Sequence, residues 1–195
     1  AKDAEITLEA NPDSAGDWKS LRNLRKAGFN RISLGMQSAC DGELREIGRV
    51  HTAEQTAAAV ESARKAGFQN LSLDLIYGLP SQTVEQWREN LSAAAALGPE
   101  HLSCYGLKVE EGTPLSTRRE EACLPGDEAQ ADMYLYAVDY LAGQGYQQYE
   151  ISNFAREGLA SRHNLKYWTL GEYMGFGPGA HSDLGGVRYA YEKDL

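Results

Sequence analysis

Four polar residues could bind a ligand, because each follows a short apolar segment of the chain. Glu9, Gln37 and Asp74 each stand at the end of such a segment, and Lys108 comes soon after a fourth one. Carboxylates accept hydrogen bonds from amino and hydroxyl groups, whereas an amide can donate as well as accept. Side by side, these residues could hold a polar small molecule. The alternative is that they only satisfy one another inside the protein.

The four apolar segments are predicted to be β-strands, at residues 6–9, 32–37, 71–75 and 102–105. In each of them apolar and polar residues alternate, which places Ile and Leu on one face and Thr and Ser on the other. A strand covered by helices on both faces usually reads as continuously apolar. The alternation therefore favours a barrel with a polar interior over an open, doubly wound sheet. In a barrel the carboxyl ends of the strands carry the chemistry, so Glu9, Gln37 and Asp74 are expected to converge there.

Helices are predicted between these strands, because helix start and stop signals recur. The sequence Arg-Lys-Ala-Gly-Phe occurs at residues 25–29 and again at 64–68, each time between an amphipathic stretch and a strand. Glycine supplies the left-handed conformation that ends many helices, and the glycines at such places are Gly28, Gly67, Gly98 and Gly145. The predicted starts are the capping boxes Thr52 with Gln55 and Thr83 with Gln86, and the N-caps Asp17 and Asp127. Helices alternating with strands predict an α/β fold with a parallel sheet.

The composition excludes several classes of protein. The 195 residues carry a net charge of −9 without a block of Lys or Arg, which argues against a nucleic-acid partner. No apolar run approaches the roughly 20 residues that span a bilayer, so no integral membrane segment is expected. The first residues lack the pattern of a signal peptide, and a cytoplasmic location is therefore expected. The three cysteines, Cys40, Cys104 and Cys123, lack the spacing of a local metal site.

Several motifs resemble the radical S-adenosylmethionine barrel of oxygen-independent coproporphyrinogen III oxidase and its relatives. They are Glu9-Ala10-Asn11-Pro12, the strand end Gly35-Met36-Gln37, Arg49, and D-L-I-Y-G-L-P-x-Q-T at residues 74–83. The resemblance covers nearly the whole chain in unbroken order. It implies a partial (β/α)6 TIM-like barrel that holds strands three to six, with a C-terminal extension. Residues 1–125 would form this part of the barrel, and residues 126–195 a final helix and strand and the start of the C-terminal region.

The resemblance also implies two cofactors, S-adenosylmethionine and a 4Fe-4S cluster, at the strand ends. Carried over by position, Glu9, Gln37, Arg49 and Asp74 would bind S-adenosylmethionine, and Lys108 would add a contact through its backbone. Arg49 is suited to pair with the methionine carboxylate. The cluster motif of the family, C-x-x-x-C-x-x-C, does not occur in this sequence. The cluster ligands are therefore expected upstream of these residues.

A motif nearer the C-terminus resembles the heme chaperone branch of this family. His163-Asn164 and Tyr167-Trp168 together match the signature H-N-x-x-Y-W. The resemblance implies a protein that binds heme and delivers it to an acceptor protein, such as a respiratory enzyme. Neutral imidazole is a good ligand for heme iron, and aromatic rings can cover a porphyrin face. His163 is therefore the predicted iron ligand, with His181 as the competing candidate.

Two alternatives stay open at this point. The first is an oxygen-independent coproporphyrinogen III oxidase, which performs radical oxidative decarboxylation in porphyrin biosynthesis. The second is an unrelated β/α-barrel enzyme, in which the carboxylates of Glu9 and Asp74 would serve as acid and base. A heme titration and an anaerobic decarboxylation assay would separate these alternatives from the heme chaperone.

Overall fold

A computed structural model describes residues 3–117 and 122–193 of the chain. These residues form two compact units, Ala1–Ala160 and Ser161–Leu195. The elements of the first unit are β1 (Thr7–Ala10), α1 (Trp18–Ala27), β2 (Arg31–Gln37), α2 (Asp41–Glu46), α3 (Ala53–Ala66), β3 (Leu71–Tyr77), α4 (Val84–Ala96), β4 (His101–Gly106), α5 (Pro114–Thr117), α6 (Asp127–Gly143), β5 (Gln147–Gln148) and β6 (Asn153–Ala155).

The first unit contains a six-stranded sheet in the order β1-β2-β3-β4-β6-β5. The strands β1 to β4 are parallel to their neighbours and correspond to the four strands that the alternation predicts. The strands β6 and β5 extend the sheet in antiparallel fashion beyond β4. The predicted α/β class is therefore confirmed, and among the described residues the sheet is open, with β1 at one edge and β5 at the other.

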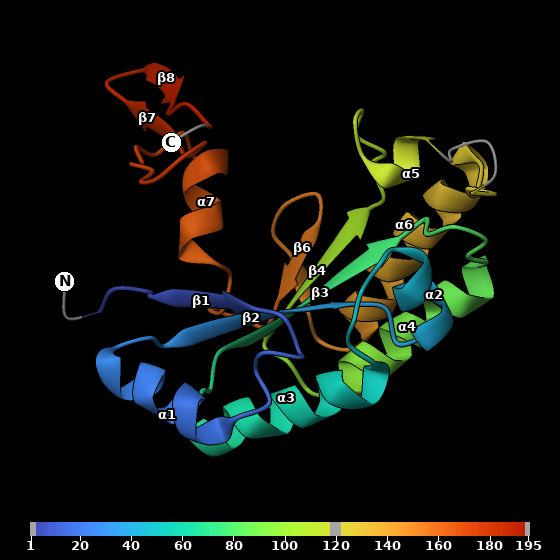
Figure 1. The fold of residues 1–195 in the computed structure, drawn as a ribbon, viewed down its shortest axis with the longest axis horizontal. Coiled ribbons are helices and arrows are strands. Elements are labelled where there is room, and N and C mark those ends of the chain that lie inside the picture. The colour runs from blue at the N-terminus through green and yellow to red at the C-terminus, as the bar shows by residue number, and fades with distance from the viewer. Residues whose placement is uncertain (1–2, 118–121, 194–195) are drawn as a thin grey trace. The chain divides into compact units, whose positions relative to one another are not determined.

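The two faces of the sheet differ in polarity, as the alternation predicts. The helices α1, α3 and α4 run along one side of β1–β3 (Figure 1), and the apolar strand residues belong to the core that they cover. The fully buried members of this core include Ile32, Leu34, Leu71, Leu73 and Leu102 from the strands and Ala59, Ala63, Trp87 and Leu91 from the helices. The other face is polar, and Ser33, Ser72 and Ser103 lie on it. This polar face is where a ligand could be held.

The predicted helix signals are largely confirmed. Thr52 and Thr83 form capping boxes with the glutamine three residues later, and Asp17 caps α1 by accepting from two backbone amides. The prediction that Asp127 is an N-cap is wrong, because Gly126 is the N-cap and Asp127 is the first residue of α6. A carboxylate in the first turn still interacts favourably with the amino end of the helix dipole.

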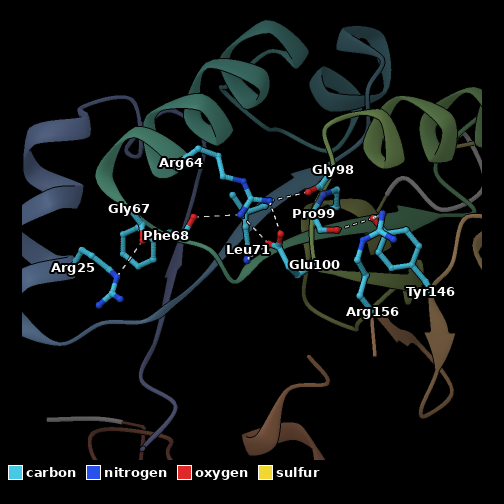
Figure 2. A network of polar contacts seen from close by, with 10 residues as sticks. All are labelled: Arg25, Arg64, Gly67, Phe68, Leu71, Gly98, Pro99, Glu100, Tyr146 and Arg156. Atoms are coloured by element: carbon cyan, nitrogen blue, oxygen red, sulfur yellow. Dashed lines mark hydrogen bonds and ion pairs between the residues drawn. The ribbon is translucent and has the colours of Figure 1, made fainter. Parts of the chain in front are cut away.

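The repeated Arg-Lys-Ala-Gly-Phe sequence makes the same two contacts in both copies, and Figure 2 shows all of them except the one between Arg25 and Phe29. Arg25 and Arg64 each donate to the carbonyl of the phenylalanine four residues later. Arg25 also donates to the Gly67 carbonyl at 3.3 Å, and Arg64 donates to the Gly98 carbonyl at 2.7 Å. Each arginine therefore links its own helix end to the glycine at the helix end of the next βα unit. Both glycines have positive φ angles, 100° and 65°, and thus take the left-handed conformation that the sequence predicts.

The second unit contains α7 (Arg162–Trp168) and a hairpin of β7 (His181–Leu184) and β8 (Val187–Ala190). The chain before the hairpin passes very close to it, since a Cβ atom added at Gly175 would lie 2.2 Å from the His181 carbonyl oxygen. The Gly175 amide also donates to the Ser182 hydroxyl at 3.0 Å. This close approach explains why a glycine stands at position 175. The predicted boundary between residues 125 and 126, which would separate this part of the barrel from the final helix and strand and the C-terminal region, stays a prediction.

Candidate functional site

Three of the predicted ligand-binding residues line the same cavity of the first unit. Glu9 at the end of β1, Gln37 at the end of β2 and Asp74 in β3 surround a cavity of about 250 Å³. We call it the strand-end cavity, and its remaining lining residues are Ala10, Asn11, Ser33 and Gly35. The convergence follows from the parallel register, in which Glu9 pairs with Ser33 and the side chains of alternate residues share one face. The lining offers carboxylate, amide and hydroxyl groups to a polar ligand.

Asp74 lies on the polar face of the sheet, where neighbouring serine side chains form hydrogen bonds with its carboxylate. The Ser33 hydroxyl lies 3.1 Å from each carboxylate oxygen of Asp74, and the Ser72 hydroxyl donates to one of them at 3.4 Å. Burial raises the pKa of Asp74, whereas hydrogen bonds from Ser103 and Ser33 act to lower it. The charged form is therefore disfavoured by burial and stabilised by hydroxyl donors. A ligand that brings a positive charge or further donors would stabilise the carboxylate.

Gln37 has an unusual backbone conformation for its residue type. Its φ angle is 63°, in the left-handed region that residues other than glycine rarely adopt. The pairing of β2 with β3 shifts its register between Leu34 and Gln37, so the bulge lies within the segment that lines the cavity. The Gln37 amide folds back over Gly35, where an added Cβ atom would lie 2.8 Å from its Nε2. Such outliers are typical of functional sites and require support from the surrounding structure.

Arg49 stands beside the strand-end cavity and also lines another one. Its Nη1 donates to the Oδ1 atom of Asn11, a lining residue, at 3.1 Å. Arg49 and Lys108 lie together in a second cavity of about 420 Å³, whose lining also includes Ile76 and Leu107. Lys108 pairs with Glu110 at 2.6 Å and is not a lining residue of the strand-end cavity. The structure thus brings Glu9, Gln37 and Asp74 together, places Arg49 next to them, and places Lys108 at the second cavity.

The predicted heme residues belong to the second unit. His163 and Tyr167 lie one turn apart in α7, with the imidazole Nε2 atom 3.0 Å from the tyrosine hydroxyl. The Tyr167 ring packs against the Tyr173 ring, with centroids 4.5 Å apart. Trp168, the last residue of α7, is half-exposed. The backbone amide of Asn164 donates to the Ser161 hydroxyl, which caps the helix. The motif therefore presents an imidazole and two aromatic rings on one short helix.

Two polar lining residues, Asn11 and Ser33, are missing from the residues predicted to bind a ligand. Asn11 follows Glu9-Ala10 directly after β1, and its position at a strand end is the signal that could have identified it. Ser33 lies in the middle of β2 and on the polar face. Its alternation with Ile32 and Leu34 predicts the direction of the side chain, but its partner Asp74 becomes evident only in the sheet.

Neither a metal site nor a membrane span is found in the part of the chain that the structure describes. No group of three or more His, Cys, Asp or Glu side chains is arranged to hold a metal ion there. Within the same residues, every helix is too short or too polar to cross a membrane.

Comparisons with known proteins identify relatives of this chain. Residues 1–94 match the radical SAM superfamily, and this segment contains Glu9, Gln37, Arg49 and Asp74. The heme chaperone HemW of Bacillus subtilis is 43% identical over 187 residues, which are 95% of this chain and 49% of that protein. Radical S-adenosyl methionine domain-containing protein 1, mitochondrial, of Mus musculus is 42% identical over 92% of this chain and 41% of that protein. The chain thus spans about half the length of these relatives or less.

A solved structure resembles the whole chain. Coproporphyrinogen III oxidase (HemN) from Escherichia coli, a radical SAM enzyme, superposes with a TM-score of 0.83 and 28% sequence identity. The match covers 100% of this chain and 48% of that enzyme. The predicted fold, part of a radical SAM barrel, is therefore confirmed.

Proposed function

Because the chain belongs to the radical SAM superfamily, we propose that its strand-end cavity binds S-adenosylmethionine in a protein that carries and delivers heme. The observation that carries the proposal is the convergence of Glu9, Gln37 and Asp74 on this cavity, in a chain 43% identical to a heme chaperone. Since the chain spans about half of that relative, the activity and partners of the whole protein belong to the proposal.

The lining residues suit S-adenosylmethionine chemically. The carboxylates of Glu9 and Asp74 can accept hydrogen bonds from its amino group and ribose hydroxyls, and the Gln37 amide can serve as donor or acceptor. Arg49 can pair with the methionine carboxylate, and its contact with Asn11 holds it beside the cavity. Lys108 would contribute through its backbone, because its side chain is paired with Glu110.

The family also implies a 4Fe-4S cluster, which would supply the electrons for radical chemistry with S-adenosylmethionine. The described residues do not fit this cluster, since none of their His, Cys, Asp and Glu side chains form a suitable group of ligands. The proposal for this chain is therefore limited to binding. Glu9, Gln37, Arg49 and Asp74 would hold and orient S-adenosylmethionine.

Heme is proposed to bind at α7, with His163 as the ligand of its iron. Imidazole nitrogen is a common axial ligand, and the adjacent rings of Tyr167 and Trp168 can pack against a porphyrin. Asn164 can add a hydrogen bond beside it. The His163 Nε2 atom contacts the Tyr167 hydroxyl, so ligation through this nitrogen requires the tyrosine to turn away. His181, in β7, is the competing ligand, and the acceptor would be a protein such as a respiratory enzyme.

A heme titration of the full-length protein tests this proposal. In His163→Ala we expect heme affinity to fall by about tenfold or more, equivalent to about 1.4 kcal/mol or more, with a shifted Soret band. His181→Ala is the matched control and should keep the affinity and the spectrum. If His163→Ala binds heme like the wild type and His181→Ala does not, the ligand is His181. If neither variant changes the titration, the proposed heme site is wrong.

The rival function is that of the structural relative, radical oxidative decarboxylation of coproporphyrinogen III. The superposition with HemN supports it, although the sequence identity of 28% is lower than the 43% shared with the heme chaperone. An anaerobic assay of the full-length protein for porphyrinogen formation distinguishes the two. Steady turnover would overturn the chaperone proposal, whereas heme binding without turnover would support it.

A further inference from the structure

We propose that Glu43 is a positioning residue for the strand-end cavity. It would not touch a ligand but would hold in place the two loops next to the residues that line the cavity. Glu43 lies in the short helix α2 and is only 5% exposed. Neither Glu43 nor its partner Asn90 is among the lining residues of the cavity. The inference rests on the proposed binding of S-adenosylmethionine, and it concerns the two loops that follow β2 and β3.

A single oxygen of Glu43 collects three hydrogen bonds from three different segments. Its Oε2 atom accepts from the Ser38 hydroxyl at 2.5 Å, from the Asn90 amide at 2.7 Å and from the Gln82 amide at 3.0 Å. Ser38 follows β2, Gln82 lies in the loop after β3, and Asn90 belongs to α4. The Oε1 atom of Glu43 is buried and makes no hydrogen bond to the described residues. All three of these hydrogen bonds to the Glu43 carboxylate therefore end on the same oxygen atom.

The first loop held in this way carries Gln37. The Ser38 hydroxyl accepts from the Cys40 amide at 2.8 Å, and the Asn90 side chain accepts from the Ala39 amide at 2.7 Å. These bonds fix the backbone directly after Gln37, which is the residue in the left-handed conformation. A strained backbone persists only where its surroundings determine it. The Glu43 network supplies that support.

The second loop held by Glu43 follows the strand that carries Asp74. The Gln82 side chain donates to Glu43 and accepts from the Gly78 amide at 2.8 Å and the Leu79 amide at 3.4 Å. Gly78 directly follows β3 and has a φ angle of 76°. Gln82 thus links Glu43 to the turn after β3 and holds the backbone of that turn in place. The Glu43 carboxylate thereby links the segments that follow β2 and β3, two of the strands that line the cavity.

Removing the Glu43 carboxylate should mainly destabilise the two loops that follow β2 and β3. Hydrogen bonds to a charged acceptor are stronger than those between neutral groups, and buried donors that lose their acceptor are costly. In Glu43→Ala, Ser38, Gln82 and Asn90 would each lose a buried partner. In Glu43→Gln, one oxygen remains to accept while the charge is lost, so the effect should be smaller.

The test uses the full-length protein and two measurements. We expect Glu43→Ala to weaken S-adenosylmethionine binding by about tenfold, because small displacements of binding groups are costly, and Glu43→Gln to weaken it less. Without ligand, hydrogen exchange of the Ala39 and Gly78 amides should become faster in both variants. A role limited to general stability would lower the melting temperature without this local pattern.

Glu100→Ala provides the matched control. Glu100 also accepts several hydrogen bonds, from Arg64 and from the Leu71 amide, but it precedes β4 and so lies at the opposite edge of the parallel strands. This variant should lose stability while it keeps its affinity for S-adenosylmethionine and its exchange rates at Ala39 and Gly78. If Glu43→Ala exchanges at these amides like the wild type, Glu43 is not a positioning residue. If exchange changes but the wild-type protein binds no S-adenosylmethionine, the proposed function fails and the support of the loops stands.

Discussion

At the scale of single residues, the surroundings of each carboxylate decide what it can do. Glu9 is exposed, whereas Asp74 is enclosed by serine hydroxyls and has a raised pKa. Both residues line the same cavity, so one cavity offers two acceptors with different environments. The sequence alternation predicts that both face the interior. It cannot predict the environment of Asp74, because Ser33 and Ser103 come from different strands.

His101 gives this protein a measurable pH dependence of stability. Burial first, and the charge of Arg31 second, lower the pKa of His101 to about 3. In the unfolded chain, His101 therefore takes up a proton as the pH falls through about 6.5, whereas in the folded chain it takes up that proton only near pH 3. Stability from this residue is fully present above pH 6.5 and is lost as the pH falls through that window. We expect the free energy of unfolding to drop by up to about 1.4 kcal/mol per pH unit there, as measured by urea denaturation between pH 7.5 and pH 4.5.

The matched variant for this prediction is His101→Gln. The imidazole contacts the Ser72 hydroxyl and the Tyr149 hydroxyl, each at 2.8 Å, and a glutamine amide can replace one or both contacts without titrating. The variant should be less stable than the wild type at pH 7.5 but should lose less stability on acidification. An equal pH dependence in both proteins would mean that other groups cause it.

At the scale of elements, the repeat predicts more than helix ends. The two Arg-Lys-Ala-Gly-Phe copies predict two equivalent βα units, and in the structure both arginines reach the glycine of the following unit (Figure 2). The two copies differ in one respect, because Arg64 also forms an ion pair with Glu100 at 2.9 Å, through two hydrogen bonds. Glu100 in turn accepts from the Leu71 amide at the start of β3.

Arg64→Ala is therefore expected to destabilise the protein more than Arg25→Ala. Loss of Arg64 removes bonds to two carbonyls and leaves a half-buried carboxylate at the start of β4, which should cost about 2 kcal/mol. Arg25 is exposed and has no such carboxylate partner among the residues that the structure describes, so its loss should cost less than about 1 kcal/mol. Urea denaturation of both variants at one pH measures the difference. Equal destabilisation would mean that the Glu100 pair contributes nothing.

Elements without periodicity escape prediction from the sequence. The helix α2 has only six residues, too few for a helical pattern to stand out, and so the position of Glu43 could not be predicted. The strands β5 and β6 have two and three residues and pair in antiparallel fashion, which a repeated βα unit does not indicate. The bulge before Gln37 likewise depends on the neighbouring strand β3. The cavity could be predicted, whereas the network that holds its loops could not.

At the scale of the whole molecule, the two proposed ligands are assigned to different units. Glu9, Gln37 and Asp74 belong to Ala1–Ala160, and His163 and Tyr167 belong to Ser161–Leu195. Each unit has its own hydrogen-bonded sheet. Local changes in one unit therefore need not alter the residues that bind the ligand of the other unit.

We accordingly expect the effects of Asp74→Asn and His163→Ala in the full-length protein to be separate. Asp74→Asn removes a charged acceptor from the cavity and should weaken S-adenosylmethionine binding by about tenfold or more, while heme affinity stays the same. His163→Ala should do the reverse. In the double variant the two losses should add, because residues without shared partners usually contribute independently. Calorimetric titration with each ligand, in the presence and absence of the other, measures all four affinities. A heme affinity that depends on Asp74 would show that the two sites are energetically coupled, and the expectation of independent sites would then be wrong.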